Sequence, residues 1–258
     1  MRFSTASRRA SVSCSEYVSV DSLGMIEPDM PHPLSRVKPD AELRIRASVL
    51  PPDLCVHVTR TLSAWSYADH IIGTMLANFL DADFEVVSSM YEALTSAEAK
   101  RAVLLAAANS SSPDDYPLVQ AVFSYVRASR KTRNAFAHHV WLTSPDLPCA
   151  MILADPKVLT DPAIRIRGMA KRGELQPKTT HIGKAVRIEM PQMPVPDRSK
   201  MIVYKEKDLA DAAQWAEVCL EAHIRLSKAC SRSYPDAEAR QTLLNEPQIA
   251  REVQRLSR

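Results

Sequence analysis

The sequence predicts a mainly α-helical fold, namely a bundle of four to five helices with a small strand-rich insertion before the last core helix. Gly is scarce (5 residues), and the 18 Pro residues can be placed in loops and at helix ends. Long segments carry apolar residues at helical spacing. Short segments rich in β-branched residues gather between about residues 146 and 206. Because 46% of the residues are hydrophobic, the chain can bury a real core.

Residues 1–52 are expected to form a flexible or irregular N-terminal segment. Prolines interrupt it at positions 28, 31, 33 and 39, and Pro51-Pro52 ends it. Its first twenty residues are rich in Arg and Ser, which faintly resembles a transit peptide, but they lack the apolar core of a signal peptide. Five widely spaced cysteines indicate reduced thiols, and no apolar run reaches the roughly 20 residues of a membrane span. We therefore expect a cytoplasmic protein that is not a membrane protein.

The first strong helix is predicted over about residues 53–80. A stripe of residues at 3-4 spacing shares one face of this helix: Leu62, Trp65, Asp69, Ile72, Leu76 and Phe79. Asp69 is the single carboxylate on that stripe. An unpaired buried carboxylate costs several kcal/mol. Three alternatives follow for Asp69: the register of the stripe is slightly shifted, Asp69 makes a local hydrogen bond, or it faces a buried arginine.

Two further helical segments follow, over about residues 83–108 and 117–140. The first contains Thr95, with Glu98 three residues later, which resembles a capping box and leaves open whether this segment is one helix or two. Pro117 suits the first turn of the second segment.

The remaining elements complete the predicted organisation. Strands are predicted at residues 150–153, 164–166, 186–190 and 201–204, followed by a helix over 208–229. The last segment is polar and is interrupted by Pro247. We therefore expect an irregular segment over 1–52, a helical bundle over 53–232 that includes a basic insertion at 146–206, and a C-terminal helical tail over 233–258.

One chemically distinctive segment lies in the predicted third helix, Lys-Thr-Arg-Asn-Ala-Phe-Ala-His-His at residues 131–139. Arg133 is followed by Asn134, and His138 stands five residues after the arginine. A guanidinium presents a planar fork of donors that suits phosphate oxygens. An imidazole titrates near neutral pH and can act as a general base or acid. These residue types are those needed to cleave RNA through its own 2′-hydroxyl without a metal ion.

The pattern resembles the active-site motif of the HEPN superfamily (higher eukaryotes and prokaryotes nucleotide-binding), in which an Arg precedes a His by four to six intervening residues and a polar residue follows the Arg. The resemblance covers roughly residues 55–142 and 208–230, and the long insertion departs from minimal members of the family. It implies a small helical bundle with this motif on its third helix.

The resemblance also implies a function. It suggests a metal-independent endoribonuclease without a cofactor, with Arg133, His138 and Asn134 as catalytic residues and with His139 in a supporting role. The place of Asp69 on the apolar stripe adds a second supporting role, in which it holds Arg133. It further implies RNA as substrate, a homodimer in which the motifs of two chains line one cleft, and a toxin or phage-defence role with an antitoxin or regulatory protein as partner.

The geometry of the motif leaves open whether His138 or His139 is the catalytic histidine. Five residues correspond to about 140° around a helix, so Arg133 and His138 do not share a face of an ideal helix, whereas Asn134 and His138 do. His139 also lies within the spacing of the family, but we prefer His138 because of its position relative to Asn134. Adjacent histidines point about 100° apart, and no second ligand cluster is evident, so we expect no metal site.

Positive charge is concentrated locally rather than globally. The formal net charge is only +3, but between Arg165 and Arg187 seven cations stand against Glu174 alone. A solvated basic loop is one explanation and guidance of an RNA backbone is the other. If the positive charge guides an RNA backbone, the expected RNA-binding residues are Arg130, Lys131, Arg165, Arg167, Lys171, Arg172, Lys184 and Arg187.

Two other interpretations of the chain stay open at this point. The first is a non-catalytic HEPN-like interaction module that binds nucleotides or proteins. The second is a helical protein in which the motif is accidental.

Overall fold

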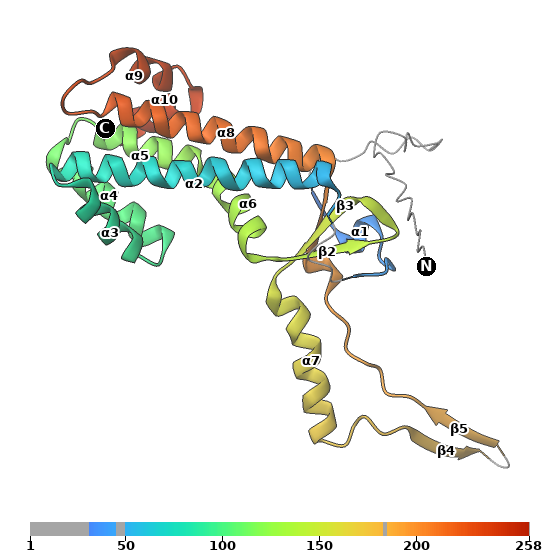
Figure 1. Ribbon diagram of the computed structural model, residues 1–258. Helices are drawn as coiled ribbons and strands as arrows, with labels where there is room; N and C mark the ends of the chain where they lie inside the picture. Colours follow the sequence, from blue (N-terminus) through green and yellow to red (C-terminus); the bar gives the residue numbers. More distant parts are fainter. Residues whose placement is uncertain (1–30, 45–49, 183–184, 258) are drawn as a thin grey trace, which may run out of the picture. The chain divides into compact units, whose positions relative to one another are not determined.

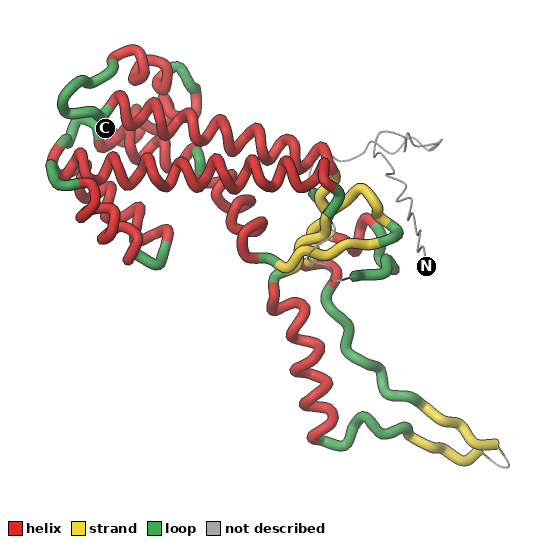
Figure 2. Tube along the Cα trace, in the orientation of Figure 1, coloured by secondary structure: helices red, strands yellow, loops and turns green. Residues whose placement is uncertain are grey.

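The computed structural model describes residues 31–44, 50–182 and 185–257. These residues form a mainly helical structure with a small antiparallel sheet placed, in sequence, before the long helix α8, which confirms the predicted fold class (Figure 2). The helices are α1 (Leu34–Val37), α2 (Pro52–Leu80), α3 (Phe84–Ala93), α4 (Ala97–Ser111), α5 (Tyr116–Tyr125), α6 (Arg127–His138), α7 (Pro156–Lys171), α8 (Glu206–Ala229), α9 (Ala237–Leu244) and α10 (Pro247–Leu256). The strands are β1 (His32–Pro33), β2 (Val140–Ser144), β3 (Leu147–Ala154), β4 (Lys178–Ile182), β5 (Ala185–Glu189) and β6 (Met201–Lys205).

Helices α2 and α8 lie side by side and form the centre of the helical part (Figure 1). Helix α2 begins with Pro52 in its first turn and ends at Leu80, and the next residue, Asp81, adopts a left-handed conformation at φ 51°. Trp65, Ile72, Leu76 and Phe79 of the predicted stripe are buried, whereas Leu62 is partly buried. Small residues such as Ala216 face them from α8, which allows the two helices to approach closely.

The segment predicted over residues 83–108 consists of two helices, α3 and α4. Asp83 caps α3 by accepting hydrogen bonds from the backbone N–H groups of Glu85 and Val86. Ser96, and not the predicted Thr95, caps α4, because the Ser96 hydroxyl accepts from the N–H of Ala99.

The segment predicted as one helix over 117–140 is also divided. Helices α5 and α6 are separated at Val126, a buried residue at the end of α5, and α6 ends at His138. The next residues continue directly into strand β2, so the predicted helix extends too far at its C-terminal end.

The C-terminal helices belong to the same core as α2 and α8. Ala239 and Leu243 of α9 and Ile249 of α10 are buried in the cluster that also contains Trp65. In addition, the Arg240 guanidinium forms an ion pair with Asp115 in the turn before α5. Residues 237–256 are thus packed on the bundle by both apolar burial and charge.

The main sheet has the order β1-β6-β3-β2, with antiparallel neighbours. Successive residues of β3 point to opposite faces. Met151 and Leu153 pack with α2 and α6 residues, whereas Ile152 packs with Leu34 and Ala41. Residues 32–44 therefore contribute a strand, a short helix and buried side chains to this sheet, although the sequence predicts an irregular segment there.

The predicted strand at residues 164–166 is wrong, because these residues lie inside helix α7. The alternating Ile-Arg-Ile pattern favours a strand locally, but Asp155 caps the helix by accepting from the N–H of Lys157, and Pro156 occupies its first turn. The strands predicted at 150–153, 186–190 and 201–204 correspond to β3, β5 and β6. The sequence pattern does not predict strands β1, β2 and β4.

No helix within the described part of the chain is long and apolar enough to cross a membrane.

We expect the Phe136→Ala substitution to lower the free energy of unfolding by about 3–5 kcal/mol. Phe136 is fully buried and its ring contacts that of Tyr204 edge-on at 5.3 Å between centroids, so truncation leaves a cavity between α6 and the sheet. Chemical denaturation followed by circular dichroism measures this loss. The control Ile164→Ala removes an exposed apolar side chain and should change stability by less than about 0.5 kcal/mol. Equal losses in both variants would contradict the assigned packing of Phe136.

Candidate active site

A pocket of about 260 Å³ lies where α2, the start of α4 and α6 meet. Helix α6 contributes four of its lining residues, namely Arg130, Arg133, Asn134 and His138. The sequence predicts that all four act on or bind RNA, and three of them are the predicted catalytic set. The structure therefore places the whole predicted catalytic set in one concave site.

The opposite walls come from elements that are distant in sequence. Helix α2 contributes Trp65 and Asp69, and the turn before α4 together with its first residues contributes Thr95, Ala97 and Lys100. The sequence predicts Trp65 as part of the core, and nothing in it links Thr95 or Lys100 to the motif. Only the packing of α4 beside α2 brings them to the pocket.

Helix α6 exposes its polar residues because it is held by two buried ones. Ser129 and Phe136 are the buried residues of α6 and lie seven positions apart, so they fall on one side of the helix. The indole N–H of Trp65 donates to the Ser129 hydroxyl at 3.1 Å. The indole N–H of Trp141 donates to the Phe136 carbonyl at 2.9 Å. Both ends of the motif helix are thereby fixed relative to α2 and the sheet.

Asp69 faces an arginine, as one of the alternatives for its position predicts, but this arginine is partly exposed and not buried. Its Oδ2 atom lies 3.7 Å from Nη2 of Arg133, and the two side chains are 32% and 29% exposed. The other terminal nitrogen of Arg133 donates to the Asn134 side-chain oxygen at 3.0 Å. Arg133 is thus oriented from two sides at the pocket wall.

Arg133 and His138 reach the same pocket from a single chain, despite their angular separation on an ideal helix. His138 is the last residue of α6, and Arg133 is long enough to turn toward it. His139, the alternative histidine, is half-buried at the end of α6, and its backbone N–H bonds the Ala135 carbonyl. It does not line this pocket.

The pocket carries an excess of positive charge. Lys100, Arg130 and Arg133 stand against Asp69 as the acidic lining residue. Lys100 Nζ lies 4.3 Å from the centroid of the Tyr91 ring, and the Arg130 guanidinium carbon lies 5.8 Å from that of Trp65. These two cations are therefore held by aromatic faces, which leaves their N–H groups available to an anion. The N-terminal end of α4, where Ala97 lines the pocket, adds partial positive charge.

A buried layer lies beneath these charges. His223 of α8 is fully buried; its Nδ1–H donates to the Cys219 carbonyl at 2.7 Å, and its ring contacts those of Trp65 and Phe123 edge-on. Burial lowers the pKa of His223 to about 4, so it is neutral at neutral pH. Burial also raises the pKa of the Tyr91 hydroxyl. The low-dielectric layer strengthens electrostatic interactions in the pocket above it.

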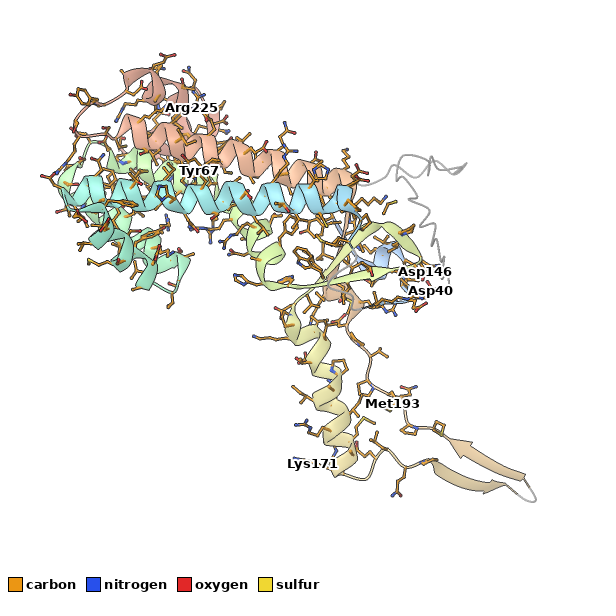
Figure 3. All side chains as sticks on the ribbon, in the orientation of Figure 1. Asp40, Tyr67, Asp146, Lys171, Met193 and Arg225 are labelled. Carbon is orange, nitrogen blue, oxygen red and sulfur yellow. The ribbon has the colours of Figure 1, made fainter. Side chains whose placement is uncertain are left out.

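The basic residues of the insertion are not brought to this pocket. Arg165, Arg167 and Lys171 lie on α7, and Arg172 at its end is bonded to Glu174. Figure 3 shows Lys171 toward the C-terminal end of α7. Of the two other predicted residues, Lys184 lies outside the described residues, and Arg187 lies on β5 with its side chain outside the described part.

Comparison with known proteins returns no match to a family model, to a curated protein or to a solved structure. The functional assignment therefore depends on the geometry of the pocket. In the described residues, no group of three or more His, Cys, Asp or Glu side chains is arranged to hold a metal ion.

The pKa of His223 predicts a specific pH dependence of stability. Between pH 6.5 and about 4 the unfolded chain binds a proton at this residue that the folded chain does not, so stability rises with pH across this window and is lost as the pH falls through it. The full effect of such a shift is about 3 kcal/mol. Urea denaturation of the wild type and of His223→Gln over this pH range measures it.

In His223→Gln, the free energy of unfolding should lose the part of its pH dependence that His223 causes. His70→Gln, which changes an exposed histidine on α2, should retain that pH dependence. Identical slopes in the wild type and in His223→Gln would show that His223 is not kept neutral by burial.

Proposed function

We propose that this protein is a metal-independent endoribonuclease that cleaves RNA by attack of a 2′-oxygen on the adjacent phosphate. The observation that carries this proposal is the meeting of Arg133, Asn134 and His138 in one pocket with two further cations, Lys100 and Arg130. A cationic pocket with an imidazole at its edge suits a phosphodiester substrate. The same three residues carry the resemblance to the motif of the HEPN superfamily, which also supports the proposal.

In the proposed reaction, the phosphate of the scissile bond lies against Arg133. His138 accepts the proton of the 2′-hydroxyl while the 2′-oxygen forms a bond to phosphorus. The bond between phosphorus and the 5′-oxygen then breaks, and the 5′-oxygen takes up a proton. The products are a 2′,3′-cyclic phosphate and a 5′-hydroxyl, so neither an oxidant nor a metal enters the balance.

The charge that develops on the phosphorane oxygens is stabilised by Arg133, with Arg130 and Lys100 nearby. Asp69 and Asn134 hold the guanidinium in position. The family resemblance further supports a homodimer, in which His138 of the second copy supplies the proton to the leaving oxygen. It also supports a toxin or defence role with an antitoxin or regulatory partner.

The first test is cleavage of a defined RNA in the presence of EDTA. Arg133→Ala and His138→Ala should each lower kcat by roughly 10²–10³, the usual effect of removing one such group. His139→Ala and Arg225→Ala serve as controls, since His139 lies outside the pocket and Arg225 is on α8 and paired with Glu221 (Figure 3). Mass spectrometry of the products should detect the cyclic phosphate.

Cleavage that persists unchanged in both Arg133→Ala and His138→Ala would exclude this pocket as the active site. RNA that stays intact with all variants, while still binding to the protein, would favour the non-catalytic interaction module.

A second test concerns the orientation of Arg133. Asp69→Asn removes the carboxylate charge but keeps the shape of the side chain, and we expect kcat/KM to fall by roughly tenfold, which corresponds to about 1.4 kcal/mol. The thermal stability should change little, because partly exposed ion pairs contribute about 0–1 kcal/mol.

The matched control for this variant is Glu217→Gln, which breaks a comparable exposed pair with Arg60 at 2.9 Å between α8 and α2. Equal activity of the two variants would mean that Asp69 does not position Arg133 for catalysis.

A further inference from the structure

A second cavity of about 180 Å³ adjoins the candidate active site along α6. Ala97, Arg130 and Asn134 line both cavities, so these three residues form a wall that the two cavities share. No sequence pattern indicates this second cavity, because its walls come from α4, the end of α5 and the first turns of α6.

The second cavity is also strongly cationic. Arg101 of α4 and Arg127, Arg130 and Lys131 of α6 line it. Glu98 is its acidic lining residue, and its carboxylate lies 3.9 Å from Arg101, at the outer limit of an ion pair. Four cations against one distant carboxylate leave the cavity with unneutralised positive charge, which favours an anionic ligand.

The two cavities are spaced along the axis of α6. Arg127 and Arg133 are six residues apart, which corresponds to about 9 Å of helix rise. A stacked nucleic-acid strand carries one phosphate about every 3.4 Å of its axis. The two residues are also about 120° apart around the helix, and Arg130 lies between them, three residues and about 60° from each. A strand that follows this row of arginines obliquely across α6, with one phosphate at Arg133, passes Arg130 and presents another phosphate to Arg127 and Arg101.

We infer that the second cavity is a subsite for a neighbouring phosphate of the RNA strand that is cut in the first cavity. This inference rests on the proposed function and extends it, because it makes substrate length a determinant of binding. Arg101, Arg127 and Lys131 are the cations that line this subsite but not the first cavity, and Arg130 lines both cavities. The ligand is a polyphosphodiester chain, and an isolated phosphate occupies only one of the two cavities.

The test uses a 2′-O-methyl oligonucleotide, which lacks the attacking hydroxyl and so reports binding without cleavage. Fluorescence anisotropy compares the wild type with the double variant Arg101→Gln/Arg127→Gln, in which glutamine retains part of the side-chain stem. For an octanucleotide we expect roughly tenfold weaker binding, and the slope of log affinity against log salt should decrease by about 0.7 for each phosphate that the variant no longer neutralises. For a dinucleotide the two proteins should bind alike.

Two controls complete the experiment. Arg225→Gln removes one positive charge from α8 outside both cavities and should bind the octanucleotide as the wild type does (Figure 3). Circular dichroism checks that the double variant is folded. Tripolyphosphate is added as a competitor, to distinguish a strand-specific subsite from a general polyanion site.

Unchanged octanucleotide binding and salt slope in the double variant would overturn the inference. So would an equal loss for the dinucleotide and the octanucleotide, or displacement of the octanucleotide by tripolyphosphate at matched phosphate concentration. Length-dependent binding that requires Arg101 and Arg127 supports the subsite even if the wild type cleaves no RNA, and in that case only the proposed nuclease activity fails.

Discussion

The attachment of helix α6 to the protein is the constraint on which the rest of the candidate site depends. Its twelve residues include four cations and no acidic residue, so the isolated helix would be short, self-repelling and unstable. Ser129 and Phe136 supply the attachment: Ser129 is bonded to Trp65 of α2, and Phe136 is packed between α2 and the sheet. Every pocket residue of α6 takes its position from these two contacts.

The positive charges on helix α6 oppose its folding, and they favour the binding of an anion. Arg127, Arg130, Lys131 and Arg133 lie three or four residues apart in several pairs, and like charges at that spacing destabilise a helix. Asp69 neutralises one of them, and the Trp65 ring offsets part of the cost at Arg130. A bound phosphate would offset part of the remaining positive charge and would stabilise the folded state to an extent set by its concentration relative to its Kd. The arrangement is therefore one in which an anion completes the electrostatics of the helix.

The sequence predicts the parts of this structure that depend on local periodicity. The apolar face of α2, including Trp65 and Ile72, and the returning helix α8 follow directly from their spacing. The break at Val126 does not, because no Gly or Pro lies between residues 118 and 140, and the division of the helix arises from tertiary packing. The helical state of residues 164–166 depends on the cap at Asp155, nine positions away, and not on the local pattern.

The candidate site likewise contains residues that the sequence pattern reveals and residues that only the fold brings to the site. Arg133, Asn134 and His138 can be found from their spacing on one helix, and Asp69 from its unusual place on an apolar stripe. Lys100 and Arg101 cannot be found from the sequence, because they lie about thirty residues before the motif and belong to no recognisable pattern. His223 is similarly hidden, because a histidine on the predicted returning helix gives no sign that it lies beneath the pocket.

The strand-rich insertion has a structural consequence for the motif itself. Arg133 and His138 are separated by about 140° on an ideal helix, yet both line one pocket, and His138 is the last residue of α6. The helix ends there because His139 is extended and the chain enters β2 at once, while Trp141 bonds the Phe136 carbonyl that the ending helix leaves free. Strand β2 is held in turn by β3, whose Met151 and Leu153 pack with Phe136. The sheet therefore sets where the motif helix stops, and it keeps His138 at the C-terminal end of that helix.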